Sequence, residues 1–226
     1  METVYKLTTQ ERTAYNGFCY EIGQEYTFPG TGPLCSGGWS HAYLSPELAV
    51  LLNPIHADFD DPLLWRAEGA VGARDGQIKI GCSRIRLIER LPLPVFTTAQ
   101  RVAWAIACAW PGGSSTWRRW ATKWLTNQNR TAEAAAKAAG AARSLWAAIE
   151  AAGAEAAEAA RAAAVGAEEA AGVAAAEAVA MEAASIAAAR AAAEAAIDGE
   201  VTDFVSLARW AATVETEWIE PEAWEG

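Results

Sequence analysis

Apolar and polar residues alternate in short segments along the first hundred residues. The alternation covers five stretches, at positions 3–8, 17–20, 25–28, 64–69 and 83–89. A period of two is typical of half-buried β-strands, and Asp75-Gly76 between the last two stretches is a hairpin turn signal. Ser45 stands where a helix N-cap belongs and Pro46 at the first helical position, which predicts a short helix. These patterns predict a small mixed β-sheet domain with one or two helices.

Helical patterns replace the alternation after a proline-rich stretch at 91–94, which we interpret as a linker. Thr98 is predicted to cap a first helix, which ends before the Pro-Gly-Gly run at 111–113. A second helix follows, and residues 203–213 are predicted to form a last one. The second helix carries three tryptophans on one face, at spacing i, i+3 and i+7: Trp117, Trp120 and Trp124.

More than half of the residues at 131–197 are alanine. A single straight helix of that length would extend for roughly 100 Å at 1.5 Å per residue. Glycine in a helix interior costs up to about 1 kcal/mol, so three glycines spaced 13 residues apart predict turns between short antiparallel helices: Gly140, Gly153 and Gly166. The predicted fold class is α+β, with a β-rich domain at 1–96 and an all-α, alanine-rich helical domain with an acidic tail at 97–226.

The formal net charge of −10 is unevenly distributed. Residues 1–96 carry a net charge of −3, residues 97–130 carry +5, and residues 131–226 carry −12. A chain this acidic is not expected to coat a nucleic-acid backbone, so we predict no direct, specific binding to nucleic acid. The basic segment can instead satisfy its charges against the acidic one within the same molecule.

The apolar segments and the cysteines also indicate the cellular location of the protein. No apolar run approaches the ~20 residues needed to span a bilayer, and the chain opens without a basic and apolar leader. Four scattered cysteines show no CxxC pair, which favours reduced thiols. We therefore expect a cytoplasmic protein without a membrane partner.

Two groups of residues could supply metal ligands. An imidazole and three carboxylates stand together at 56–61, a mix that suits a hard divalent cation. Cys35 and His41 could share a zinc ion. The competing interpretations, a polar loop and a structural turn, need no ligand and are preferred, so we predict no metal and no cofactor.

Nucleophilic catalysis would require a cysteine or serine beside a base. With only two histidines in the chain, the available dyads are Cys35 with His41 and Cys19 with His56. No glycine-rich dinucleotide motif, Walker A motif, GxSxG or HExxH occurs. We therefore predict no catalytic residues and no enzyme.

Aromatic and charged residues in two places are candidates for contact with a partner. The tryptophan face of the second helix is interpreted first as core, although the nearby Arg118, Arg119, Lys123 and Arg130 could grip phosphates. The acidic, aromatic C-terminus could be solvated surface, or could imitate nucleic-acid charge and anchor in a partner through tryptophan. The predicted partner-binding residues are Trp117, Arg118, Arg119, Trp120, Lys123, Trp218, Glu220 and Trp224.

Two sequence blocks carry a resemblance to a known family. The first is Gly-Phe-x-Tyr-x-x-Gly-x-x-Tyr at 17–26, and the second is Leu-Cys-x-x-Gly-aromatic-His at 34–41, with Ser40 inserted before His41. With a closing strand rich in Ile and Arg, residues 3–96 resemble a domain of unknown function that is common in bacteriophage and prophage accessory proteins. The helical part is similar to the alanine-rich region that often follows this domain, and more distantly to bacterial immunity proteins.

The resemblance implies a phage or mobile-element origin but no enzymatic activity. Small accessory proteins of that origin often bind and disable host machinery, including CRISPR complexes. We therefore expect a non-enzymatic inhibitor that binds a host protein complex, most concretely a nucleic-acid-guided defence complex, by occlusion or subunit displacement. Two alternatives stay open: a small enzyme or metal-binding domain at 1–96 that uses His41 and His56, and an immunity protein that neutralises a toxin.

Overall fold

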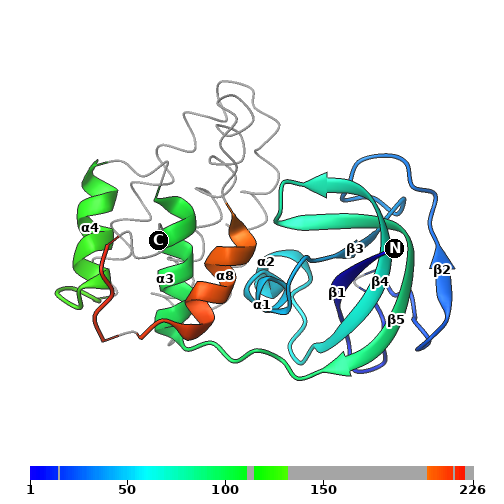
Figure 1. Cartoon of the computed structure of the whole chain (residues 1–226), viewed down its shortest axis with the longest axis horizontal. Coiled ribbons are helices and arrows are strands. Elements are labelled where there is room, and N and C mark those ends of the chain that lie inside the picture. The colour runs from blue at the N-terminus through cyan, green and yellow to red at the C-terminus, as the bar shows by residue number, and fades with distance from the viewer. Residues whose placement is uncertain (15, 111–114, 132–202, 216, 222–226) are drawn as a thin grey trace. The chain divides into compact units, whose positions relative to one another are not determined.

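The computed structural model describes residues 1–14, 16–110, 115–131, 203–215 and 217–221 (Figure 1). The chain divides into two compact units, one of Met1–Val95 with Asp203–Ala208 and one of Phe96–Thr202 with Arg209–Gly226. Apart from Thr131, the predicted alanine-rich array at 131–197 lies outside the described residues. No helix in the described ranges is long and apolar enough to cross a membrane.

The first unit contains an antiparallel sheet of five strands, which confirms the predicted N-terminal sheet. The order of the paired strands is β1-β4-β5-β2, and β3 also pairs with β5. The strands are β1 (Glu2–Thr8), β2 (Glu25–Thr27), β3 (Ser40–Ala42), β4 (Leu63–Asp75) and β5 (Lys79–Leu91).

The β4–β5 hairpin is the longest part of the sheet, with 13 residues in each strand. Its turn contains Gly76 at φ +50, a left-handed conformation that glycine adopts without a steric penalty. The strand pairing shifts at three places along the hairpin. Such irregularities bend the strands and increase their twist, so the hairpin curls across the unit (Figure 1).

A two-residue bridge closes the curled sheet. The backbone N–H of Tyr5 on β1 donates to the carbonyl of Tyr43, just after β3, at 2.9 Å, and the Tyr43 N–H donates back at 2.8 Å. The strands β1, β4, β5 and β3 therefore follow one another in a closed circuit. The core inside it comprises Val4, Tyr20, Ala42, Leu63, Trp65, Ala67, Ile80, Cys82, Ile85 and Leu87.

The strand predicted at 17–20 was wrong. That segment makes only an isolated bridge, between Thr13 and Cys19, and its aromatic rings pack on one another instead. The Phe18 ring lies 4.9 Å from that of Tyr20, with further rings 5.1 and 5.3 Å away. Gly17 and Gly23 turn the chain at positive φ on both sides, which leaves too short a segment for a strand.

Two short helices follow β3, as the sequence predicted. In α1 (Pro46–Leu51) the N-cap Ser45 accepts a hydrogen bond from the Leu48 N–H at 3.1 Å. The helix buries Leu48, Ala49, Val50 and Leu51. It leads directly into α2 (Asn53–His56), which ends on a histidine.

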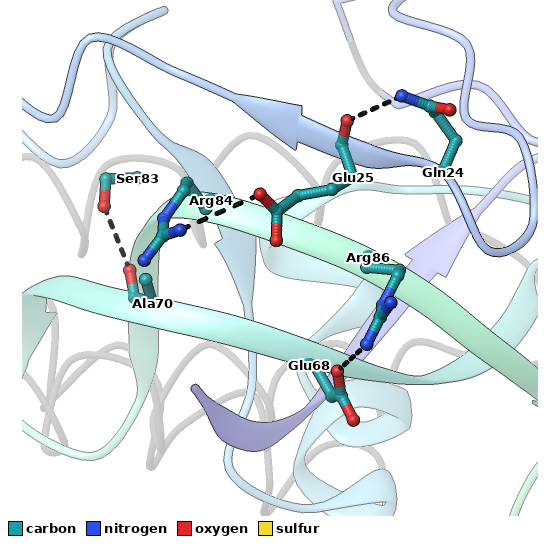
Figure 2. Close-up of polar contacts among 7 residues, drawn as sticks. All are labelled: Gln24, Glu25, Glu68, Ala70, Ser83, Arg84 and Arg86. Carbon is teal, nitrogen blue, oxygen red and sulfur yellow. Dashed lines mark hydrogen bonds and ion pairs between the residues drawn. The ribbon is translucent and has the colours of Figure 1, made fainter.

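The outer face of the sheet carries ion pairs. Figure 2 shows Arg84 of β5 reaching Glu25 of β2, and Arg86 of β5 reaching Glu68 of β4, at 3.8 and 2.5 Å. Exposed pairs of this kind contribute little stability. They do place carboxylates beside arginines on the outside of the sheet.

The second unit contains α3 (Thr98–Ala109), α4 (Ser115–Leu125) and the end of α8 (Phe204–Thr213). The α3 cap is Thr97 and not the predicted Thr98, because Thr97 accepts from the Gln100 N–H while the Gln100 side chain accepts from the Thr97 N–H. The helices share a buried cluster, which includes Val102, Ala103, Ile106, Trp110, Ala121, Trp124, Leu125 and Ile219.

Candidate functional site

The first unit contains a cavity of about 260 Å³. Basic, thiol and phenolic side chains that are remote in sequence meet around it: Lys6, Cys35, His41, Tyr43, His56 and Lys79. None of the described residues that line it is an aspartate or a glutamate. The lining is therefore basic, although the chain as a whole is acidic.

Strands β1, β3 and β5 and helix α2 each contribute one basic side chain to this lining. Lys6 lies on the same side of β1 as the buried Val4 and Thr8. Lys79 is the first residue of β5, next to the hairpin turn. His41 is the middle residue of β3, and the end of α2 supplies His56. The closure of the sheet brings these four basic groups to one cavity.

Lys6 is almost completely buried, with 5% of its surface exposed. Its Nζ donates to the backbone carbonyl of His41 at 2.8 Å and lies 5.0 Å from the centre of the Tyr20 ring. Burial lowers the Lys6 pKa to about 8, although the nearby Cys82 thiol acts in the opposite direction. Its partners are neutral, so the positive charge of Lys6 is not balanced locally.

Lys79 is the second buried lysine, with 7% of its surface exposed. Its Nζ donates to Cys35 Sγ at 2.9 Å. Lys6 and Lys79 are the only charged residues among the buried side chains of the described ranges. The four ion pairs found there all join arginine to glutamate, so neither lysine is paired with a described carboxylate.

Both histidines are held as neutral rings. His41 Nε2 is hydrogen-bonded to the Leu34 carbonyl, and burial lowers its pKa, as do the nearby Lys79 and Lys6. His56 Nδ1 and the Tyr43 hydroxyl share a hydrogen bond of 3.2 Å, with the two rings stacked. Burial, assisted by Lys79 and His41, lowers the His56 pKa to about 3. The cavity thus disfavours additional positive charge.

The carboxylate run at 56–61 does not converge on the imidazole. His56 faces Tyr43, Asp61 accepts from Gln10 Nε2 at 2.8 Å, and Asp58 and Asp60 are exposed. Among the described residues, no group of three or more His, Cys, Asp or Glu side chains could hold a metal ion.

The predicted cysteine–histidine pairs have different outcomes. Cys35 and His41 both line the cavity, but their nearest polar partners are the Lys79 ammonium and the Leu34 carbonyl. An ammonium 2.9 Å from the sulfur would repel a metal cation. Cys19 is not in the lining, and its Sγ donates to the Glu11 carbonyl at 3.5 Å, so the structure does not bring it to His56.

Several of the candidate residues on and just after α4 make contacts within the second unit. Trp124 is buried and Trp120 packs against the same cluster, while the side chain of Trp117 is outside the described part. Arg118 donates to the Trp110 carbonyl at 3.1 Å. Arg130 donates to the Trp124 carbonyl at 2.9 Å, with its guanidinium 4.4 Å from the Trp124 ring centre. Three basic side chains of α4 are exposed: Arg118, Arg119 and Lys123.

The C-terminal candidates lie beside a buried anchor. Ile219 is buried, and its N–H donates to the Leu125 carbonyl at 3.1 Å. Trp218 before it is 56% exposed and donates from Nε1 to Glu220 at 2.9 Å. Trp224 lies outside the described residues. Trp218 and Glu220 are therefore presented together at the surface.

Sequence reasoning did not single out Lys6, Lys79 or Tyr43. One signal was present for Lys6, because strand alternation places it on the same face as Val4. For Lys79 no local signal exists, because its hydrogen-bond partner Cys35 is remote in sequence.

Comparisons with known proteins do not assign a family. No family model, curated protein or solved structure matches the chain. The function is therefore inferred from the chemistry of the cavity and of the surface.

Proposed function

We propose that this is a non-enzymatic binding protein whose N-terminal unit holds an anionic group, a phosphate or a carboxylate, in the cavity between Lys6 and Lys79. The observation that carries the proposal is the position of these two lysines. They are the only buried charged residues of the described part, and both line one cavity without a described acidic residue.

Burial of these lysines has an energetic cost that a ligand would offset. Removing an ammonium from water costs several kcal/mol unless an opposite charge compensates for it. The neighbours of Lys6 and Lys79 are a carbonyl, a thiol and an aromatic ring, none of which carries a full negative charge when the thiol is protonated. A bound anion would supply the missing charge.

The remaining lining would suit the rest of a small organic ligand. Flat or apolar parts of the ligand can lie against the aromatic side chains of the lining, which are Tyr20, Phe28, Trp39, Tyr43 and Phe59. The neutral rings of His41 and His56 already have hydrogen-bond partners in the protein. They are therefore poorly placed as general bases, which favours binding over turnover.

Calorimetric titration of the full-length protein with inorganic phosphate and with acetate tests this proposal. We expect Lys6→Met and Lys79→Met each to weaken anion binding about ten- to hundredfold. This is the loss in affinity expected when one hydrogen bond to a charged group is removed. Lys123→Met, at an exposed site on α4, is the matched control and should bind like the wild type. Equal affinity in all four proteins, or no binding to the wild type, would contradict the proposal.

The same binding protein is proposed to act as a phage-type inhibitor of a host complex, most concretely a nucleic-acid-guided defence complex in the bacterial cytoplasm. One surface observation supports this second role. Trp218 is exposed beside Glu220, and exposed tryptophan is enriched among residues that dominate protein–protein affinity. Inhibition would then result from occlusion or displacement of a subunit.

Titration of a target complex with the purified protein tests the inhibitory role. Complete inhibition should require about one copy per target, and Trp218→Ala should weaken it at least tenfold. Ile22→Ala changes a side chain of similar exposure in the first unit and should have no effect. Inhibition at far less than one copy per target would indicate catalysis instead.

A further inference from the structure

Lys6 combines three properties that make a primary amine reactive. It lines the cavity, it is buried, and its hydrogen-bond acceptor is a neutral carbonyl. Burial lowers its pKa to about 8, so roughly half of the amine is neutral at pH 8, against less than about 1% for an exposed lysine. A neutral, desolvated lysine amine is the nucleophile that forms imines with carbonyl compounds.

The other side chains of the cavity determine which class of carbonyl compound would bind beside Lys6. Lys79 brings a second positive charge to the same lining, where no described residue is acidic. A ligand with a carboxylate next to its carbonyl could place the carboxylate at Lys79 and the carbonyl carbon at Lys6. The volume of about 260 Å³ suits a small molecule of this type.

We propose that Lys6 captures small 2-oxo acids as an imine, with Lys79 holding the carboxylate. This inference rests on the proposed anion binding and names its ligand class. The Lys6 nitrogen attacks the carbonyl carbon, and the C=O electron pair moves to the oxygen. The nitrogen then loses its two protons, the oxygen leaves as water, and a C=N bond remains. No oxidant or reductant is needed, and hydrolysis returns both partners unchanged.

Reductive trapping of the full-length protein tests the proposal. Glyoxylate is the probe, cyanoborohydride reduces any imine to a stable carboxymethyl amine, and peptide mass spectrometry locates the product. We expect Lys6 to be labelled at least tenfold faster than the exposed Lys123, and excess inorganic phosphate to slow the labelling of Lys6 but not that of Lys123. The rate at Lys6 should increase with pH, be half-maximal near pH 8 and level off above about pH 9.

Two variants separate the chemistry from the fold. Lys6→Arg keeps a positive charge but forms no imine, so it should lose the fast labelling. Lys79→Met keeps the amine but removes the carboxylate partner, and should slow labelling of Lys6 at least tenfold. If Lys6 is labelled no faster than Lys123 while phosphate still binds, imine capture is wrong and anion binding stands. If Lys6 is labelled no faster than Lys123 and phosphate does not bind either, both imine capture and anion binding are wrong.

Discussion

The buried polar side chains of the first unit form specific pairs. The Tyr20 hydroxyl and Ser40 Oγ lie 2.9 Å apart, and Trp65 Nε1 donates to Thr8 Oγ1 at 2.9 Å. A buried polar group without its partner costs about 1–3 kcal/mol. These pairs therefore fix which residues surround the cavity, because Tyr20 and Ser40 both belong to its lining.

Ser40→Ala is expected to lower the free energy of unfolding by about 1–3 kcal/mol, because it leaves the buried Tyr20 hydroxyl without its hydrogen-bond partner. Tyr20→Phe should have a similar cost, and the double variant should cost clearly less than the sum. Urea titration of the full-length protein measures all three. Tyr26→Phe is the control, because its hydroxyl bonds to the exposed Glu21 N–H. Additive costs would contradict coupling of the pair.

The low pKa of His56 predicts a pH-dependent stability. Its folded-state pKa of about 3 lies below the ordinary value of 6.5. As pH falls from 6.5 toward 3, the unfolded chain binds a proton that the folded protein does not. The stabilisation is complete above pH 6.5 and decreases below it, by up to about 1.4 kcal/mol per pH unit.

Measurements of the free energy of unfolding between pH 7 and 5 test this effect. Most of this pH range lies above the pKa values of ordinary carboxylates, so their titration contributes little. His56→Gln removes the titrating group and should flatten the dependence. A smaller slope should remain, because the pKa of His41 is lowered as well. An unchanged slope in His56→Gln would show that the folded protein protonates His56 freely.

At the scale of elements, close contacts with glycine position the segment that carries Cys35. A Cβ on Gly81 of β5 would lie 2.6 Å from Leu34 Cδ1 and 3.0 Å from Trp39 Cγ. The backbone of β5 therefore admits both side chains only because this residue is glycine. Trp39 in turn forms part of the cavity lining.

Gly81→Ala is expected to displace Leu34 and Trp39, to lower the free energy of unfolding by about 1–3 kcal/mol, and to weaken anion binding. Gly37→Ala is the matched control, since Gly37 lines the same cavity but its Cβ would meet no atom within 4 Å. Thermal unfolding and phosphate titration of both variants provide the comparison. Equal effects of the two substitutions would contradict the packing argument.

Local signals explain which elements could be predicted. The Ser45-Pro46 helix start and the Asp75-Gly76 turn depend on neighbouring residues, and both are present. The segment at 17–20 alternates like a strand, but its aromatic rings pack among themselves. The Tyr5–Tyr43 bridge joins residues that are remote in sequence. The alternation of neighbouring residues cannot indicate a contact between distant segments. The cavity, which the Tyr5–Tyr43 bridge helps to form, could therefore not be predicted.

At the scale of the whole molecule, the charge distribution leads to a prediction about nucleic-acid binding. The net charge is −10, which repels a polyanion over a Debye length of about 8 Å at physiological salt. Within the basic segment, the guanidiniums of Arg118 and Arg130 bond to backbone carbonyls of their own unit. Arg118 is nevertheless exposed, as are Arg119 and Lys123 on the described α4.

The three exposed cations of α4 set the salt dependence expected for a contact between this helix and duplex DNA. Each neutralised phosphate contributes about −0.9 to the slope of log affinity against log salt, so the slope should be no steeper than about −3. Fluorescence anisotropy with a labelled duplex between 50 and 200 mM salt measures it. Arg119→Ala with Lys123→Ala should weaken this binding and reduce the slope to about −1, while Ile22→Ala should change neither. A slope near −5 would mean that further basic residues contact phosphates, and that charge does not exclude nucleic acid as a partner.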